Sequence, residues 1–85
     1  MCGIIGISSN KSVSASIISS LKKLEYRGYD SAGIATLSDG VINEVKSEGR
    51  VDSLEKNFDL TNLKGNIGIG HVRWATHGVP NRINA

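Results

Sequence analysis

The sequence has few of the features that mark several classes of protein. It contains a single cysteine, which cannot form an internal disulfide, so no oxidising compartment is implied. No apolar run approaches the roughly eighteen residues of a membrane span. The apolar stretch GIIGI near the start is too short to be the core of a signal peptide, and no basic residues precede it. We therefore expect a cytoplasmic protein with no membrane partner.

No charge of one sign dominates the chain either. Ten Lys and Arg against eight Asp and Glu leave a net charge of +2, and these residues are scattered along the sequence. A nucleic-acid-binding protein presents a basic face or stripe, so we expect no nucleic-acid partner. With 39% hydrophobic and 21% charged residues, the composition is that of a folded globular protein.

The spacing of the hydrophobic residues predicts an α+β fold. The first helix is expected to have Ser12 as its N-cap and Gly28 just past its end, and the second to have Asp52 as its cap. The dipeptide Asp39-Gly40 supplies the positive φ angles of a type I′ hairpin turn. The chain is expected to begin with a strand at 3–8, followed by a helix between Ser12 and Gly28 and by hairpin strands at about 32–38 and 41–48. A helix with Val51, Leu54 and Phe58 on its inner face follows, and then a strand at 66–74, where Gly68 and Gly70 allow close backbone approach.

Beyond Trp74 this periodicity is lost. A sheet made of these strands would have open edges and one uncovered face. We therefore interpret residues 2–85 as the first part of a larger domain that continues beyond this chain.

The single cysteine lies directly behind the initiator methionine. Methionine is commonly removed before a small residue, which would leave the thiol and the α-amine of Cys2 on one carbon. Because the reference pKa of an α-amine is about 7.7–8.0, that amine can act as the base for its own nucleophile near neutral pH. Gly3 would let substrate and backbone approach the sulfur closely. The alternative is that Cys2 is a small buried hydrophobic residue at the start of a strand.

Two further stretches place polar groups at the ends of predicted strands. In EYRGYDSAGIA, residues 25–35, the polar groups can serve a site, or Asp30 and Ser31 can simply form a turn. In GHVRWATHG, residues 70–78, Arg73 can bind a carboxylate through two hydrogen bonds, Thr76 and His77 can add others, and Trp74 can shield the ligand. Together they describe an amino-acid pocket. Separately, Trp74 can be a core residue, Arg73 part of a surface ion pair, His71 a strand histidine and His77 a solvated loop residue.

A metal site made of Cys2, His71 and His77 is also compatible with the residue types. No pair of these ligands has a recognised metal-binding spacing, however, and we predict no metal.

Three stretches together resemble one enzyme family. Cys2-Gly3-Ile4, LEYRGYDSAGIA and GHVRWATHG are similar to the N-terminal glutaminase domain of the glutamine–fructose-6-phosphate aminotransferase (isomerizing) family, also called glucosamine-6-phosphate synthases. The initial CGI is shared by all class II glutamine amidotransferases, which have the N-terminal-nucleophile (Ntn) hydrolase fold, whereas the other two stretches distinguish this family. The resemblance spans all 85 residues.

The resemblance implies a fold and a reaction. The chain would be the incomplete N-terminal part of a four-layer α/β/β/α sandwich, in which Cys2, freed of Met1, attacks the side-chain amide of L-glutamine. A γ-glutamyl thioester forms, ammonia leaves, and water releases glutamate. In the full family enzyme, a separate sugar-isomerase part uses the ammonia to convert fructose 6-phosphate to glucosamine 6-phosphate. No cofactor is implied, and family enzymes are often homo-oligomers.

The resemblance also implies roles for individual residues. Arg73 would bind the α-carboxylate of glutamine, with Thr76 and His77 lining the same pocket. Trp74 would lie in the loop that closes over the substrate. Arg27 and Gly28 would lie beside Cys2 and help to hold it.

One part of the family's catalytic site has no counterpart in these residues. The Asn-Gly pair of the oxyanion hole and an acidic residue for the substrate amine lie downstream in the family's pattern. Because loss of one oxyanion donor typically costs about 10²–10³ in rate, we expect little or no activity from the 85-residue chain alone. The alternative is an inactive gene fragment or truncated sequence that binds glutamine weakly, pairs with a complementary fragment, or has no catalysis of its own.

Overall fold

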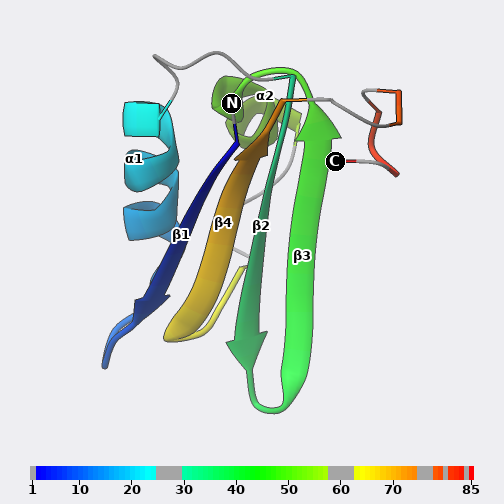
Figure 1. The fold of residues 1–85 in the computed structure, drawn as a ribbon. Coiled ribbons are helices and arrows are strands. Elements are labelled where there is room, and N and C mark those ends of the chain that lie inside the picture. Colours follow the sequence, from blue (N-terminus) through cyan, green and yellow to red (C-terminus); the bar gives the residue numbers. More distant parts are fainter. Residues whose placement is uncertain (1, 25–29, 58–62, 75–77, 80, 84) are drawn as a thin grey trace.

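The computed structural model describes residues 2–24, 30–57, 63–74, 78–79, 81–83 and 85. The four described strands form one antiparallel sheet in the order β1-β4-β2-β3 (Figure 1). This arrangement, with two helices beside the sheet, confirms the predicted α+β class. In chain order the elements are β1 (Gly3–Ser8), α1 (Ser14–Leu24), β2 (Ser31–Ser38), β3 (Val41–Glu48), α2 (Val51–Asn57) and β4 (Ile67–Arg73).

The predicted hairpin is confirmed. Strands β2 and β3 pair from Ser31↔Glu48 to Ser38↔Val41, which leaves two residues in the turn. Those residues, Asp39 and Gly40, have φ angles of 51° and 76°. Positive φ at both central positions is the geometry of a type I′ turn, whose twist matches that of the flanking strands.

Both helices begin at a different residue from the one predicted. Helix α1 starts at Ser14, and the carbonyl of Val13 accepts the hydrogen bond from Ile17 N at 2.9 Å, so Val13 and not Ser12 precedes the first turn. Helix α2 starts at Val51, so Asp52 lies inside its first turn. The carboxylates of Asp52 and Glu55 instead form ion pairs with the ammonium of Lys22 on α1. The predicted helix end at Gly28 and the inner-face residue Phe58 lie outside the described residues.

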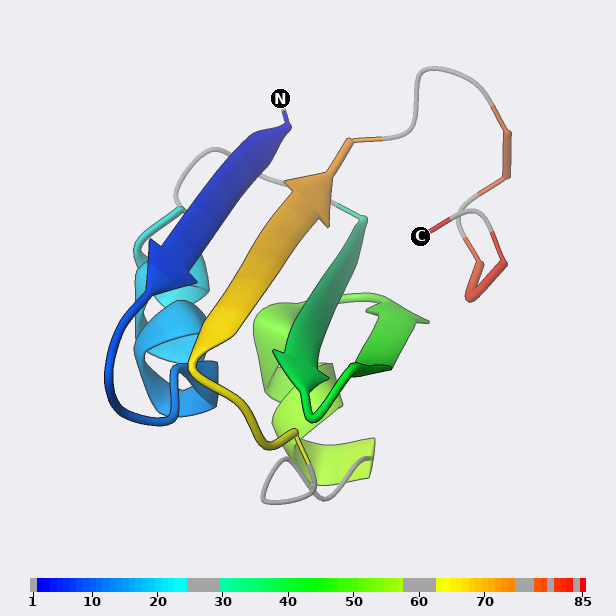
Figure 2. The same ribbon diagram turned by 90° about the horizontal axis from the view of Figure 1, so that it is seen from below.

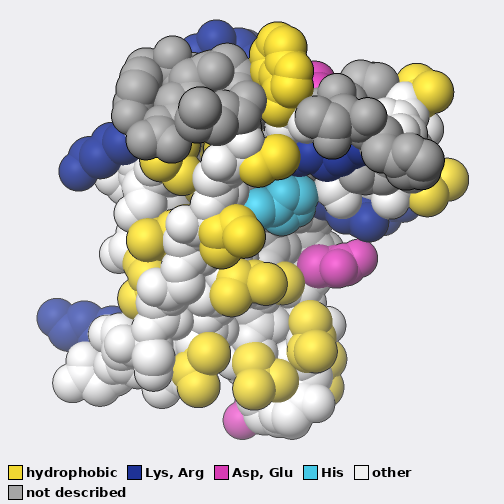
Figure 3. Space-filling view, viewed as in Figure 1, with side chains coloured by type: hydrophobic (Ala, Val, Ile, Leu, Met, Phe, Trp, Pro, Cys, Tyr) yellow, Lys and Arg dark blue, Asp and Glu magenta, His cyan; other side chains and the backbone are white. Residues whose placement is uncertain are grey.

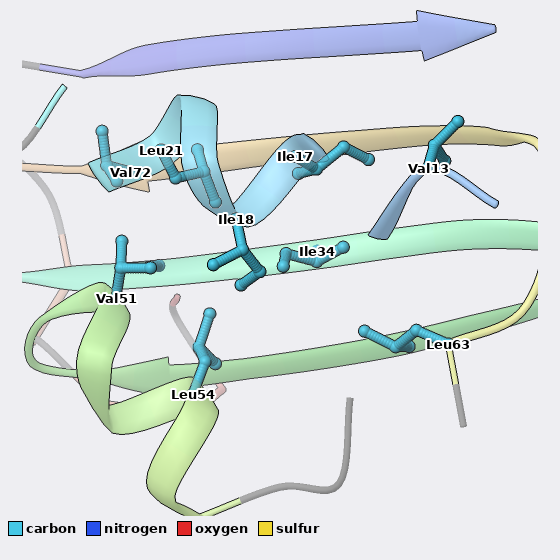
Figure 4. Close-up of a cluster of buried hydrophobic side chains, with 10 residues drawn as sticks. Val13, Ile17, Ile18, Leu21, Ile34, Val51, Leu54, Leu63 and Val72 are labelled. Atoms are coloured by element: carbon cyan, nitrogen blue, oxygen red, sulfur yellow. The ribbon is translucent and has the colours of Figure 1, made fainter. Parts of the chain in front are cut away.

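Both helices cover the same face of the sheet (Figure 2), and the core lies between them and the strands. Helix α1 packs closely on β4 because two residues of that strand have no side chain. An added Cβ would lie 2.8 Å from Cδ1 of Ile17 at Gly68 and 2.5 Å from Cγ2 of Ile17 at Gly70. The predicted close approach is therefore confirmed. The buried residues, most of them shown in Figure 4, are Val13, Ile17, Ile18, Leu21, Ala32, Ile34, Val51, Leu54, Leu63 and Val72.

No helix of the described residues covers the opposite face of the sheet, as predicted, and we call it the open face. Its side chains alternate along each strand with the buried ones. Hydrophobic side chains gather on it over the strands (Figure 3), and Ile4, Ile42 and Ile69 are 80%, 70% and 58% exposed. Among the residues that the structure describes, no helix is long and apolar enough to cross a membrane.

Candidate active site at the end of the open face

The sheet topology brings the three sequence stretches to one end of the molecule. Strand β4 lies between β1 and β2 and is antiparallel to both, so its end lies beside both of their beginnings (Figure 1). Gly3 pairs with Val72, and Ser31 pairs with Arg73. Residues from the beginning, the middle and the end of the chain therefore meet, although they are far apart in the sequence.

Cys2 lies directly against the end of β4. The backbone N–H of Trp74 donates a hydrogen bond to Cys2 Sγ at 3.4 Å, and the thiol lies 3.8 Å from the carbonyl oxygen of Trp74, which it can use as an acceptor. The thiol is nevertheless exposed. The alternative of a buried hydrophobic cysteine is therefore wrong, because the residue is held by backbone groups and is open to solvent.

A cavity of about 370 Å³ adjoins the thiol, a volume within the range of about 300–1,000 Å³ typical of small-molecule sites. Gly3 contributes to the cavity, yet a Cβ added to it would lie 2.8 Å from Cδ1 of Leu24 on the helix side of the sheet. The missing side chain of Gly3 thus also serves the packing of α1. The lining residues are Cys2, Gly3, Ile4, His71, Val72, Arg73 and Ala85.

The guanidinium of Arg73 is the positively charged group of the predicted pocket. It is on the open face, because its neighbour Val72 points into the core. Its Nη2 donates a hydrogen bond to the carbonyl oxygen of Gly78 at 3.2 Å, and its own carbonyl oxygen accepts one from the backbone N–H of Asp30 at 2.8 Å. The guanidinium therefore lies at the same end of the sheet as Cys2 and already contacts an oxygen acceptor.

His71 lines the same cavity two residues before Arg73. Burial lowers its pKa from the ordinary value of 6.5, and the positive charges of Lys46 and Arg73 lower it further. The ring lies over Gly33, where an added Cβ would be 2.6 Å from His71 Nε2. His71 is thus a histidine within a strand, which was one of the alternatives considered for it, and its neutral form is favoured beside the pocket.

The structure describes only some of the residues of the predicted site. Trp74 is 50% exposed, so the alternative of a core tryptophan is wrong. The remaining predicted binding residues, Arg27, Gly28, Thr76 and His77, lie outside the described residues. In the described part of the chain, no group of three or more His, Cys, Asp or Glu side chains is placed to hold a metal ion.

Sequence reasoning missed two lining residues that strand alternation could have indicated. Ile4 lies two residues after Cys2, and His71 lies two residues before Arg73, so each shares the face of a predicted site residue. The two are also direct partners across β1 and β4. A search for residues at a spacing of two from each predicted site residue would have found both.

Ser31 extends the sheet, and its hydroxyl does not form the turn that was one of the two alternatives for this segment. The backbone N–H of Asp30 donates to the carbonyl oxygen of Arg73, and its carbonyl oxygen accepts from the N–H of Gly49 at 2.6 Å. Ser31 is the first residue of β2 and is fully buried. Its hydroxyl makes no hydrogen bond, so it does not stabilise a turn.

Comparison with known proteins agrees with this arrangement. The chain is 55% identical over all 85 residues to the glutamine–fructose-6-phosphate aminotransferase (isomerizing) of Clostridium acetobutylicum, and 56% identical to that of Pyrococcus horikoshii. It spans 14% of the length of each of these relatives. No family profile matches the chain.

A solved structure supports the relationship at the level of the fold. The glutamine phosphoribosylpyrophosphate amidotransferase from B. subtilis, in complex with ADP and GMP, matches 91% of this chain with a TM-score of 0.80 and 28% sequence identity. The match covers 17% of that chain. The sheet and its two helices thus correspond to part of an Ntn amidotransferase domain. Over its whole length, the chain is therefore homologous to the N-terminal part of the glutamine–fructose-6-phosphate aminotransferases.

Proposed function

We propose that this chain forms the N-terminal part of a glutaminase domain whose nucleophile is the thiol of Cys2. After removal of Met1, the α-amine of Cys2 accepts the thiol proton, and the sulfur attacks the side-chain carbonyl carbon of glutamine. The carbon–nitrogen bond of the amide breaks, ammonia leaves with the transferred proton, and water hydrolyses the γ-glutamyl thioester to glutamate. The observation that carries this proposal is the exposed sulfur, held against Trp74 at the edge of a cavity that also contains Arg73.

Two described residues beside Cys2, Trp74 and Arg73, have a part in this reaction. The N–H of Trp74 fixes the direction of the sulfur. The guanidinium of Arg73 replaces its contact with Gly78 by a charged and therefore stronger bond to the α-carboxylate of glutamine. From the family resemblance we also propose that Trp74 covers the substrate, and that four residues outside the described part of the chain complete the site: Thr76 and His77 at the carboxylate, and Arg27 and Gly28 beside the nucleophile.

The open face supports the proposal that residues 2–85 are only part of the domain. An antiparallel sheet can leave one face to solvent, but that face is then polar. Here Ile4, Ile42 and Ile69 are exposed on it. We propose that a second sheet, carried by the part of the domain that follows in the relatives, covers these side chains and supplies the oxyanion hole.

The complete enzyme would use the released ammonia to convert fructose 6-phosphate to glucosamine 6-phosphate in a sugar-isomerase part outside this chain. L-Glutamine is the substrate of the part described here. We propose that the chain by itself has little or no turnover, because the donors that stabilise the oxyanion come from residues outside it.

A chimaera tests this function directly. This chain replaces the matching N-terminal residues of the C. acetobutylicum relative, and release of glutamate from glutamine is measured together with the intact mass of the protein. We expect glutaminase activity and the loss of Met1. Cys2→Ala abolishes activity, and so does insertion of one residue between Met1 and Cys2, which keeps the thiol but moves the amine away from it.

Two results would contradict the proposal. Turnover that persists in chimaera molecules that retain Met1 would exclude the terminal amine as the base. An inactive chimaera, in which the C. acetobutylicum sequence is active, would favour the alternative of an inactive gene fragment with no catalysis of its own.

A further inference from the structure

We propose that the hydroxyl of Ser31 is a second binding group for the α-carboxylate of glutamine, acting beside Arg73. This inference rests on the glutaminase function proposed above and adds a residue to its specificity pocket. The sequence left Ser31 either in a turn or at a site, and the structure removes the turn, because the hydroxyl makes no hydrogen bond.

The first observation is the burial of Ser31. The residue is 0% exposed, and its Oγ has no hydrogen-bond partner. A buried hydroxyl without a partner costs about 1–3 kcal/mol relative to a satisfied one. Buried polar groups are nearly always paired, so an unpaired one in a folded protein needs an explanation. A polar ligand atom would provide the missing partner once the groups that cover Ser31 move aside, because the residue is fully buried.

The second observation is the direction of the Ser31 side chain. The neighbouring Ala32 points into the core between sheet and helices, so Ser31 points to the open face. Its partner across the β2–β4 pair is Arg73, which also points to the open face. Side chains that are opposite each other in an antiparallel pair have Cβ atoms about 4.5–5.5 Å apart, so the two residues can hold one carboxylate together.

The third observation is the distance to the nucleophile. Gly3 pairs with Val72, so Cys2, one residue earlier, lies opposite Arg73, and Arg73 lies opposite Ser31. The three residues form one row across strands β1, β4 and β2. With an interstrand spacing of about 4.8 Å, Cys2 and Ser31 are roughly 9.5 Å apart.

This separation suits glutamine. The four carbon–carbon bonds between its amide carbon and its carboxylate carbon span about 5 Å when extended. A reacting sulfur lies about 3–3.5 Å from the amide carbon, and a hydroxyl–carboxylate hydrogen bond adds about 2.7 Å. These lengths together reach roughly 11 Å, slightly more than the row. A glutamine somewhat short of full extension can therefore bridge the row, with its amide at Cys2 and its carboxylate between Ser31 and Arg73.

The charges along the row agree with this direction of binding. Arg73 supplies the positive charge, and its Nη2 already contacts the carbonyl oxygen of Gly78. A serine hydroxyl adds a donor without adding charge. The pair can thus distinguish glutamine from amides that lack the α-carboxylate, because without that group the Ser31 hydroxyl stays unsatisfied and the guanidinium keeps only its uncharged acceptor on Gly78.

The experiment compares Ser31→Ala with Ser8→Ala in two settings. Ser8 is an exposed serine of β1 at the opposite end of the sheet, and it serves as the matched control. In the 85-residue chain, labelling of Cys2 by the diazo-ketone 6-diazo-5-oxo-L-norleucine gives the inhibitor constant KI and the limiting rate. In the chimaera, glutamine hydrolysis gives KM and kcat.

We expect Ser31→Ala to raise KI and KM about five- to tenfold and to change the limiting rate and kcat less than twofold. Ser31→Thr, which keeps the hydroxyl, should recover most of the affinity. Labelling by iodoacetamide, which has no carboxylate, should be equal in all variants. Because Ser31→Ala removes an unsatisfied group, its thermal midpoint should not fall, whereas loss of a purely structural bond would lower it.

The failures of the two proposals are distinguishable. Equal KI and KM for Ser31→Ala and the parent would overturn the role of Ser31 and leave the glutaminase function intact. A fall in kcat with unchanged KM would also overturn it, because the hydroxyl would then act at the reacting end. Absence of both saturable labelling and chimaera activity in the parent would overturn the glutaminase function and this inference with it.

Discussion

Replacing Gly70 by alanine is expected to disturb the helix packing that positions strand β4. An added Cβ would lie 2.5 Å from Cγ2 of Ile17 and 3.1 Å from Cδ1 of Leu21, and both side chains are fully buried. Cγ2 of a β-branched residue in a helix has almost no rotamer freedom, so helix α1 itself must move. Overpacking of this kind costs about 1–3 kcal/mol. Alanine recovers about 0.4–1 kcal/mol by restricting the unfolded chain, which leaves a net loss of roughly 1–2 kcal/mol.

Thermal unfolding followed by circular dichroism measures this loss as a fall in Tm of roughly 5–15 °C. Gly6→Ala is the matched control, because Gly6 is on the open face and an added Cβ there would meet only Cγ2 of Ile69, at 3.9 Å. Its Tm should stay the same or rise slightly. Ile17→Leu, which removes Cγ2, should restore part of the stability lost in Gly70→Ala. Equal Tm values for Gly70→Ala and the parent, or equal losses in both alanine variants, would refute the reasoning.

Three further predictions concern the packing and the charges. The pKa of His71 is lowered in the folded chain, so the unfolded chain binds the proton more readily, and the free energy of unfolding should fall as the pH drops below about 6.5. The urea midpoint of His71→Asn should therefore depend less on pH than that of the parent, and parallel pH profiles of the two proteins would contradict this. Lys22→Met removes ion pairs to partly exposed carboxylates and should lower the free energy of unfolding by less than about 1 kcal/mol. Because salt screens exposed ion pairs, about 0.5 M NaCl should abolish this difference, whereas a larger decrease that does not depend on salt would point to packing instead. Leu54→Ala empties a fully buried site beneath α2 and should cost about 2–5 kcal/mol in urea unfolding, whereas a loss below 1 kcal/mol would show that the helix is not anchored there.

The local elements followed from local chemistry, and they could be predicted well. The type I′ turn at Asp39-Gly40 was predicted because few dipeptides adopt positive φ at both positions, and the two strands beside it follow from the turn. The helix starts were predicted less accurately. Ser12 and Asp52 are both good N-cap residues, but the ends of α1 and α2 are decided by contacts with other elements. Asp52 and Glu55 pair with Lys22, a partner on another helix that no local pattern indicates.

The candidate site was predicted in part. Cys2 and Arg73 were identified from residue type and position, and the structure brings them to one cavity. His71 and Ile4 were missed as lining residues because their contribution depends on which face of each strand they share. Ser31 could not be placed between a turn and a site, since its burial and its unpaired hydroxyl are visible only when the strands are assembled.

Local interactions specify which segments become helices and strands, because turn geometry, apolar spacing and strand propensity act over a few residues. The insertion of β4 between β1 and β2, antiparallel to both, does not follow from such local interactions. That insertion depends on contacts between residues up to 72 positions apart, such as the bond from Trp74 to Cys2. The approach of α1 to the glycines of β4 stabilises the same arrangement. The elements were thus a local consequence of the chain, whereas the meeting of thiol, guanidinium and buried hydroxyl at one end of the sheet was a consequence of long-range packing.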